Sequence, residues 1–240
     1  MREQSSTQSS RQIGVLAFHK IGTPAETNFS YIPEAIFDAQ LAQIAGSGWQ
    51  VISPDAFLEG LEQPDTLPER ALLLTFDDAY RSMYTAALPI LGSFGYPCAL
   101  FVPTLFIGAT NAFDHGLQPE EPLCTWDELL ELQRHGVSLQ SHSVSHRVFS
   151  ELNPGDIHEE VQRSKAALES RTGRPVRMFA YPYGEAGLDP EATGVALCQA
   201  GYQAAFLVRG FSHRPPSTQP FSVGRLLMEP DTNLRRVLGD

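Results

Sequence analysis

Two short segments of the sequence carry residue types that bind metal ions. His142 and His146 are separated by three residues, a common spacing of zinc ligands. Asp77 and Asp78 are adjacent carboxylates after a strongly apolar run, where a cation would offset the repulsion between two partly buried negative charges. Two imidazoles and one carboxylate leave coordination positions open, so the pattern predicts a metal site that can bind water.

Each signal has a plainer interpretation when it is taken alone. The aspartates could be a solvated pair that opens a helix, whose dipole favours negative charge at that end. The histidines could be two surface residues in a serine-rich turn. The two signals together, each after an apolar run, favour the metal site, with Asp78, His142 and His146 as candidate ligands.

Two further groups of polar residues also follow apolar runs. His19 comes directly after residues 13–18, and a Tyr-Pro-Tyr-Gly turn at 181–184 comes after residues 176–180. A single histidine at such a position is more often packed than catalytic, and an aromatic–proline turn is often structural. Together with the two metal-binding segments, however, they make four groups that are expected to meet on one face of the protein.

These groups are positioned by a regular alternation of short apolar runs and amphipathic stretches. Strands are predicted at residues 13–18, 49–52, 71–76, 98–102, 137–140, 176–180, 204–208 and 222–228. Helices are predicted at residues 33–45, 54–61, 84–94, 125–134, 154–171, 190–200 and 233–238. Thr125 and Glu128 have the spacing of a capping box at the start of one helix.

The alternation predicts an α/β fold with a mostly parallel sheet. Seven or eight strand–helix units fit a distorted (β/α) barrel in a single domain at residues 13–240, preceded by a flexible tail at 1–12. A doubly wound open sheet is the alternative. In both folds the active site lies at the carboxyl ends of the strands, where the four polar groups are expected.

Composition limits the partners that the protein can have. Seventeen basic and 28 acidic side chains give a net charge of −11, which disfavours nucleic acid and anionic membranes. The sequence contains no apolar run of about 18 residues, so no transmembrane helix is predicted. The start of the chain has no apolar stretch of a signal peptide, so we expect a cytoplasmic protein, or an exported one if an export segment is missing. The widely spaced Cys98, Cys124 and Cys198 indicate buried free thiols.

The combined motifs resemble those of the polysaccharide deacetylases of the NodB-homology type, carbohydrate esterase family 4. Residues 75–78 (Thr-Phe-Asp-Asp) match the first motif of that family, 142–146 match the second, and 179–184 match a common form of the third. The resemblance covers nearly the whole chain beyond the tail. Residues 15–19 are similar to the early histidine motif of the poly-N-acetylglucosamine deacetylase branch.

The resemblance implies a distorted barrel, one divalent metal ion, usually zinc, and the removal of acetyl groups, most often N-acetyl, from a carbohydrate. It implies that Asp77 is the general base and that the backbone N–H of Tyr183 is an oxyanion donor. The metal ligands implied are Asp78, His142 and His146, and the remaining substrate-binding candidates are Tyr181, Pro182 and Arg225.

Two departures from the family pattern change the expected roles. Ala180 stands where the third motif usually has an arginine, and Met228 ends a late strand where the family usually has its acid histidine. His19 is therefore the candidate general acid, and Arg225 is the candidate partner of Asp77. A carbohydrate-binding relative without turnover and a metal-dependent amidase on a non-sugar substrate are the alternative functions; the oligomeric state stays open.

Overall fold

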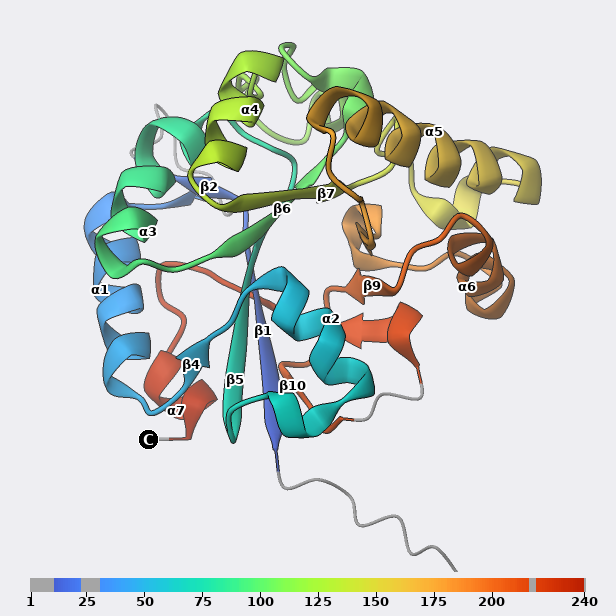
Figure 1. Cartoon of the computed structure of the whole chain (residues 1–240). Coiled ribbons are helices and arrows are strands. Elements are labelled where there is room, and N and C mark those ends of the chain that lie inside the picture. Colours follow the sequence, from blue (N-terminus) through green and yellow to red (C-terminus); the bar gives the residue numbers. More distant parts are fainter. Residues whose placement is uncertain (1–10, 23–30, 216–218, 240) are drawn as a thin grey trace, which may run out of the picture.

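Parallel strands form the centre of the molecule (Figure 1). The computed structural model describes residues 11–22, 31–215 and 219–239. The main sheet has the order β10-β1-β5-β6-β7-β8-β9-β11, and only β10 is antiparallel to its neighbour on this path. The six longest of these strands are β1 (Gln12–Phe18), β5 (Arg70–Phe76), β6 (Cys98–Val102), β7 (Val137–Ser141), β8 (Met178–Ala180) and β9 (Ala204–Leu207).

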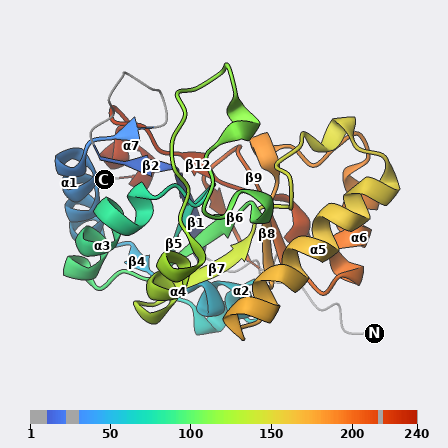
Figure 2. The ribbon, with the colours of Figure 1, turned by 90° about the horizontal axis from the view of Figure 1, so that it is seen from above.

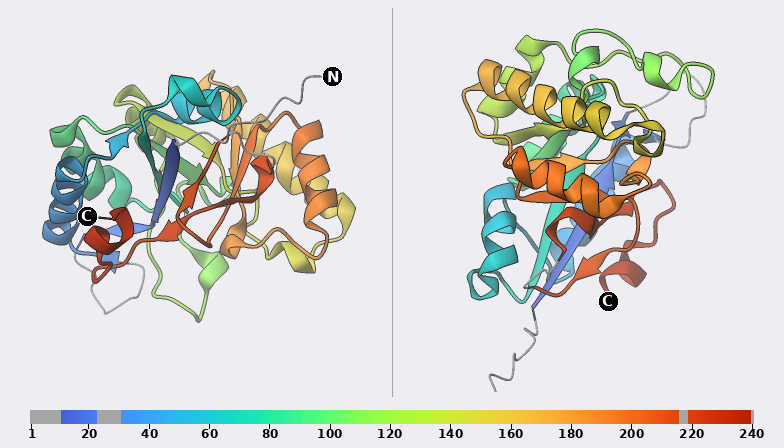
Figure 3. Two further views of the ribbon diagram at one scale, coloured as in Figure 1. Left: turned by 90° about the horizontal axis from the view of Figure 1, so that it is seen from below. Right: turned by 90° about the vertical axis from the view of Figure 1, so that its right-hand side faces the viewer.

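Helices surround this sheet (Figures 2 and 3). They are α1 (Glu34–Gly46), α2 (Pro54–Glu62), α3 (Leu88–Phe94), α4 (Trp126–Arg134), α5 (Pro154–Thr172), α6 (Pro190–Gln199) and α7 (Leu234–Leu238). The short strands are β2 (Lys20–Ile21), β3 (Tyr31–Ile32), β4 (Gln50–Val51), β10 (Ser212–His213), β11 (Val223–Gly224) and β12 (Leu226–Leu227). No helix in the described part of the chain is long and apolar enough to cross a membrane.

The last strand nearly closes the sheet into a barrel. Residues 223–227 pair first with β9 through β11 and then with β1 through β12. The chain changes partner at Arg225, so the single strand expected at 222–228 is split in two. Gly224 permits the change, because a Cβ atom there would lie 1.9 Å from the carbonyl oxygen of Arg209. The predicted single-domain, distorted (β/α) barrel is thus confirmed.

The strand alternation divides the core into two layers. Inward residues of β1 and β5, such as Val15 and Leu73, pack with Phe57 of α2 inside the barrel. Outward residues, such as Leu16 and Leu74, pack under the surrounding helices. Inside and outside are therefore both apolar, which is why the strands appear in the sequence as continuous apolar runs.

Most predicted elements are found within two residues of their expected ends, with local corrections. A π-helical turn, Met83–Ala87, takes the first part of the helix expected at 84–94. β8 begins at Met178, not at Val176. The N–H of Val176 donates to the side chain of Glu169 and the N–H of Met178 donates to the side chain of Gln140, so these groups do not bond to a neighbouring strand backbone. The Thr125–Glu128 capping box is confirmed. The tail expected at 1–12 lies outside the described residues up to position 10, and Gln12 already belongs to β1.

The expectation of three buried thiols is wrong for Cys198, which is exposed on α6, whereas Cys98 and Cys124 are buried. Burial raises the pKa of Cys98 and of Cys124 to about 12.

Because the thiolate is the reactive form, we predict that a disulfide reagent at about pH 8 modifies one thiol in the folded protein and three in denaturant. Cys198→Ser should abolish the reaction of the folded protein; persistent fast labelling would contradict this assignment.

Candidate active site

Strand alternation brings side chains from several strand ends into one polar cluster. His19 and Asp77 continue the inward-facing positions of β1 and β5, and Arg225 continues the inward position of Val223. His142 follows β7 and bonds the backbone of β8. Residues 19, 77, 142 and 225 are far apart in sequence, so their meeting depends on the strand register.

The three candidate metal ligands converge on a common point. The Nε2 atoms of His142 and His146 lie 3.3 Å and 3.1 Å from Oδ1 of Asp78. One ligand atom from each residue can be chosen so that all lie within 4.8 Å of one another. All three residues are buried, and two imidazoles and a carboxylate are a donor set that suits a divalent ion.

Hydrogen bonding around the cluster also fits a bound cation. Nδ1 of His142 donates to the carbonyl oxygen of Ala180 at 2.7 Å, which directs the lone pair of Nε2 toward Asp78. Oδ1 of Asp78 is buried and accepts no well-aligned hydrogen bond from the described residues. Burial acts to raise the pKa of Asp78, but the charge of His146 and the close polar contacts with the His142 and His146 side chains outweigh it and hold that pKa well below its usual value, so Asp78 is an anion at neutral pH.

Unusual backbone conformations are concentrated at the same loops. The non-glycine residues with positive φ in the described chain are Asp78, Ala79, Ser143, His146 and Tyr183. Such conformations are uncommon outside glycine and persist where the surrounding structure enforces them. Their coincidence with all three predicted motif segments supports a functional site.

Glu160 of α5 holds the histidine loop in its strained conformation. Its carboxylate accepts the backbone N–H groups of Val144 and Ser145 at 2.7 Å and 2.8 Å and the Ser145 hydroxyl at 2.5 Å. Glu160 cannot be recognised from the sequence, because an acidic side chain on an amphipathic helix carries no signal that separates it from its solvated neighbours.

Asp77 is paired with Arg225 inside the barrel. Two guanidinium nitrogens donate to the two carboxylate oxygens, each at 2.7 Å, and Thr75 accepts a further hydrogen bond at 3.1 Å. Burial acts to raise the pKa of Asp77, but the charge of Arg225 outweighs it and lowers that pKa, so the carboxylate stays ionised. The structure thus shows the pairing expected from the missing third-motif arginine.

His19 lies beside this pair, with Nε2 at 3.9 Å from Oδ2 of Asp77. The N–H of Met228 donates to the carbonyl oxygen of Ala17, so the late strand that ends at Met228 lies next to β1. His19, which follows β1, is therefore close to the place of the family's late histidine. The side chain of His19 is 22% exposed. His213 bonds Gly224 and pairs with the start of β1, away from this cluster.

The Tyr-Pro-Tyr-Gly turn reaches the cluster only through Tyr183. The ring of Tyr183 lies 4.8 Å from that of His146, and its backbone has φ of 56°. Gly184 is required behind it, since a Cβ there would lie 2.6 Å from Val208. Tyr181 and Pro182 are buried, as is Arg225, and the substrate-binding role expected of these three stays a prediction.

Comparison with known proteins agrees with this geometry, because residues 65–205 match the family described as polysaccharide deacetylase. The chain belongs to the polysaccharide deacetylase family. It is 26% identical over 197 residues, or 82% of its length, to YxkH of Bacillus subtilis, a protein named for the same family. It is 33% identical over 125 residues, half of its length, to the poly-beta-1,6-N-acetyl-D-glucosamine N-deacetylase of Escherichia coli K12. The chain covers 64% of the first relative and 18% of the second.

Solved structures show the same deacetylase architecture. IcaB from Ammonifex degensii superposes with a TM-score of 0.82 at 25% identity, covering 95% of this chain and 96% of its own. The Streptococcus pyogenes deacetylase PplD, solved with acetate, superposes with a TM-score of 0.80 at 22% identity, and the match covers 95% of this chain and 97% of PplD. These superpositions confirm the barrel, and the family model over residues 65–205 confirms the family that the motifs indicated.

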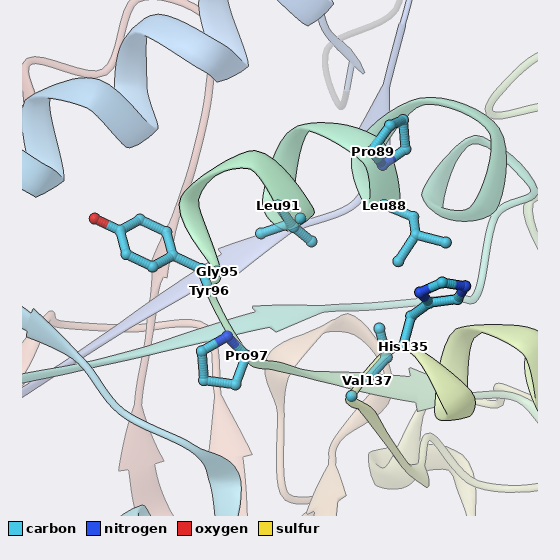
Figure 4. Close-up of a pocket in the computed structure, with 10 residues that line it drawn as sticks. Leu88, Pro89, Leu91, Gly95, Tyr96, Pro97, His135 and Val137 are labelled. Atoms are coloured by element: carbon cyan, nitrogen blue, oxygen red, sulfur yellow. The ribbon is translucent and has the colours of Figure 1, made fainter.

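An apolar pocket of this family member lies away from the polar cluster (Figure 4). It measures about 590 Å³ and is lined by residues of α3, the segment before β6 and the segment before β7, among them Leu88, Tyr96 and His135. These segments lie at the amino ends of β6 and β7, opposite to the ends that carry the candidate ligands. The pocket therefore has no part in the site.

The anchoring role of Glu160 generates a prediction about metal affinity. Glu160→Gln removes the charge that holds the Val144 and Ser145 N–H groups, so we expect about 10-fold weaker zinc binding in a chelator competition, the lower end for loss of a supporting partner. Glu159→Gln is the matched control, since Glu159 lies next in sequence with a largely exposed side chain. Equal affinity in both variants would show that the loop holds its shape without Glu160.

Proposed function

We propose that the protein is a metal-dependent hydrolase that removes acetyl groups, N-acetyl above all, from a carbohydrate. The observation that carries the proposal is a buried carboxylate, Asp77, that is held by Arg225 directly beside the Asp78–His142–His146 cluster. This places a base outside the ligand set, as hydrolysis by an activated water requires. A mixed nitrogen and oxygen donor set supports zinc as the ion.

Each residue of the candidate site has a defined task in this reaction. An ion held by Asp78, His142 and His146 would supply Lewis-acid polarisation of the acetyl carbonyl and acidify water. Asp77 accepts the proton of the attacking water, and the backbone N–H of Tyr183 donates to the developing oxyanion. His19 then protonates the leaving nitrogen as the C–N bond breaks, because an amide nitrogen leaves poorly as an anion. Acetate and a free amine are the products.

The substrate class is proposed from the relatives. The Escherichia coli relative is named as an N-deacetylase of poly-beta-1,6-N-acetyl-D-glucosamine, which supports an N-acetylated hexosamine chain as the substrate. The net charge of −11 is compatible with a product that gains positive charge with each acetyl group removed.

The decisive experiment is acetate release from a panel of acetylated glycans. We expect release from N-acetylglucosamine oligomers, loss of activity with a chelator and recovery when zinc is added. Zinc binding without acetate release from any glycan would indicate a carbohydrate-binding relative. Release only from non-sugar amides would indicate an amidase.

The two aspartates should differ in role. Asp77→Asn should keep the metal and lose about 100-fold or more in kcat, because the general base is removed. Asp78→Asn should weaken metal binding itself, since it exchanges a charged ligand for a neutral one. Elemental analysis after dialysis, together with acetate release, separates the two effects; an empty site in Asp77→Asn with a full site in Asp78→Asn would reverse the assignment.

The role of His19 can be tested with two leaving groups. His19→Ala should lose about 100-fold in rate on an N-acetyl substrate and much less on an activated acetate ester, whose leaving group needs no proton. Burial lowers the pKa of His19, so the loss of the acid form should give an alkaline limb below the usual imidazole value of about 6.5, and the variant should lack this limb. Equal losses on both substrates would exclude His19 as the acid.

A further inference from the structure

A network of hydrogen bonds ends beside His146 and involves none of the predicted metal ligands. The Tyr183 hydroxyl lies 3.2 Å from Oδ1 of Asp114 and 3.3 Å from the carbonyl oxygen of Phe113, so it donates to the loop residues 113–114. Oδ2 of Asp114 accepts from the Gln118 side chain at 2.9 Å, and the Gln118 carbonyl accepts from Nζ of Lys20 at 2.7 Å. The network thus joins β2, the loop between β6 and α4, and the turn after β8.

Both charged residues of this hydrogen-bond network are buried. Lys20 is 0% exposed and Asp114 is 4% exposed. Nζ of Lys20 lies 4.4 Å from the centre of the Tyr80 ring, which offsets part of the cost of burying its charge. A buried lysine and a buried aspartate joined through one glutamine are expensive to maintain, so the arrangement indicates a specific task.

The loop that carries Asp114 covers the metal-binding histidine. The ring of Phe113 stacks 4.1 Å from the ring of His146, and Tyr183 packs against His146 from a different direction. Farther along, the N–H of Cys124 donates to the carbonyl oxygen of Ala79, beside Asp78. Figure 2 shows this loop, in green, projecting well beyond the strands.

We propose that Asp114, fixed by Lys20 through Gln118, is a positioning residue that latches the β6–α4 loop to the Tyr183 turn. The latch holds Tyr183 against His146 and sets the place of the Tyr183 backbone N–H, which would face the reacting carbonyl. The catalytic part of this inference rests on the proposed deacetylase function. The latch itself does not, because it concerns contacts within the folded chain.

The test uses substitutions that remove single hydrogen-bonding groups. Tyr183→Phe deletes only the hydroxyl, Asp114→Asn removes the charge, and Lys20→Met removes the ammonium group. Tyr96→Phe is the matched control, because Tyr96 lies in the pocket at the opposite ends of the strands. We expect hydrogen exchange of residues 107–122 to rise about 10-fold in the three latch variants and to stay unchanged in the control.

Kinetics then separate positioning from general stability. Each latch variant should lose about 10-fold in kcat on an N-acetyl glycan, with KM and zinc affinity within about 2-fold of the wild type. Tyr183→Phe combined with Asp114→Asn should lose no more than the larger of the two single losses, because Tyr183→Phe already removes the hydroxyl that donates to Asp114. Unchanged exchange in Tyr183→Phe and Asp114→Asn would overturn the latch, and unchanged kcat in an active enzyme would overturn its positioning role. A wild type that releases no acetate would sink the proposed function and the catalytic part, whereas the exchange result would still decide the latch.

Discussion

The ion pair between Asp77 and Arg225 is the constraint on which the site and the barrel both depend. Arg225 lies inside the barrel with its guanidinium over the rings of Phe101 and Phe206, where an unpaired charge would be very costly. Removing one partner of such a buried pair typically destabilises a protein by about 3–5 kcal/mol. Because Arg225 stands where the last strand changes its partner from β9 to β1, the contact that orients the Asp77 carboxylate also lies at the closure of the barrel.

The other groups of the site are held by loops that would not keep their shape alone. Asp78, His146 and Tyr183 all have left-handed backbone conformations, which non-glycine residues rarely adopt. Neighbouring elements stabilise them: Glu160 binds the histidine loop, and Asp114 binds Tyr183. The barrel thus provides the positions, whereas side chains from other segments of the chain provide the orientation.

Much of the fold and part of the site could be predicted from the sequence because their signals are local. Apolar runs such as 71–76 and 98–102 mark strands, since buried parallel strands need apolar residues on both faces. The spacing of His142 and His146 and the adjacent Asp77 and Asp78 are equally local. Supporting residues such as Glu160 and Asp114 could not be recognised, because nothing in their sequence neighbourhood distinguishes them from solvated acids.

By itself, then, the sequence determined the strand–helix alternation, the barrel class and the motif residues at the strand ends. The tertiary structure decided which of these residues touch. It placed Arg225 against Asp77 across 148 positions of sequence and buried the side chain of Tyr181. It also exposed Cys198 on α6. The reason is that strand register and barrel closure are collective properties: a contact between distant residues exists only after every intervening strand has found its neighbour.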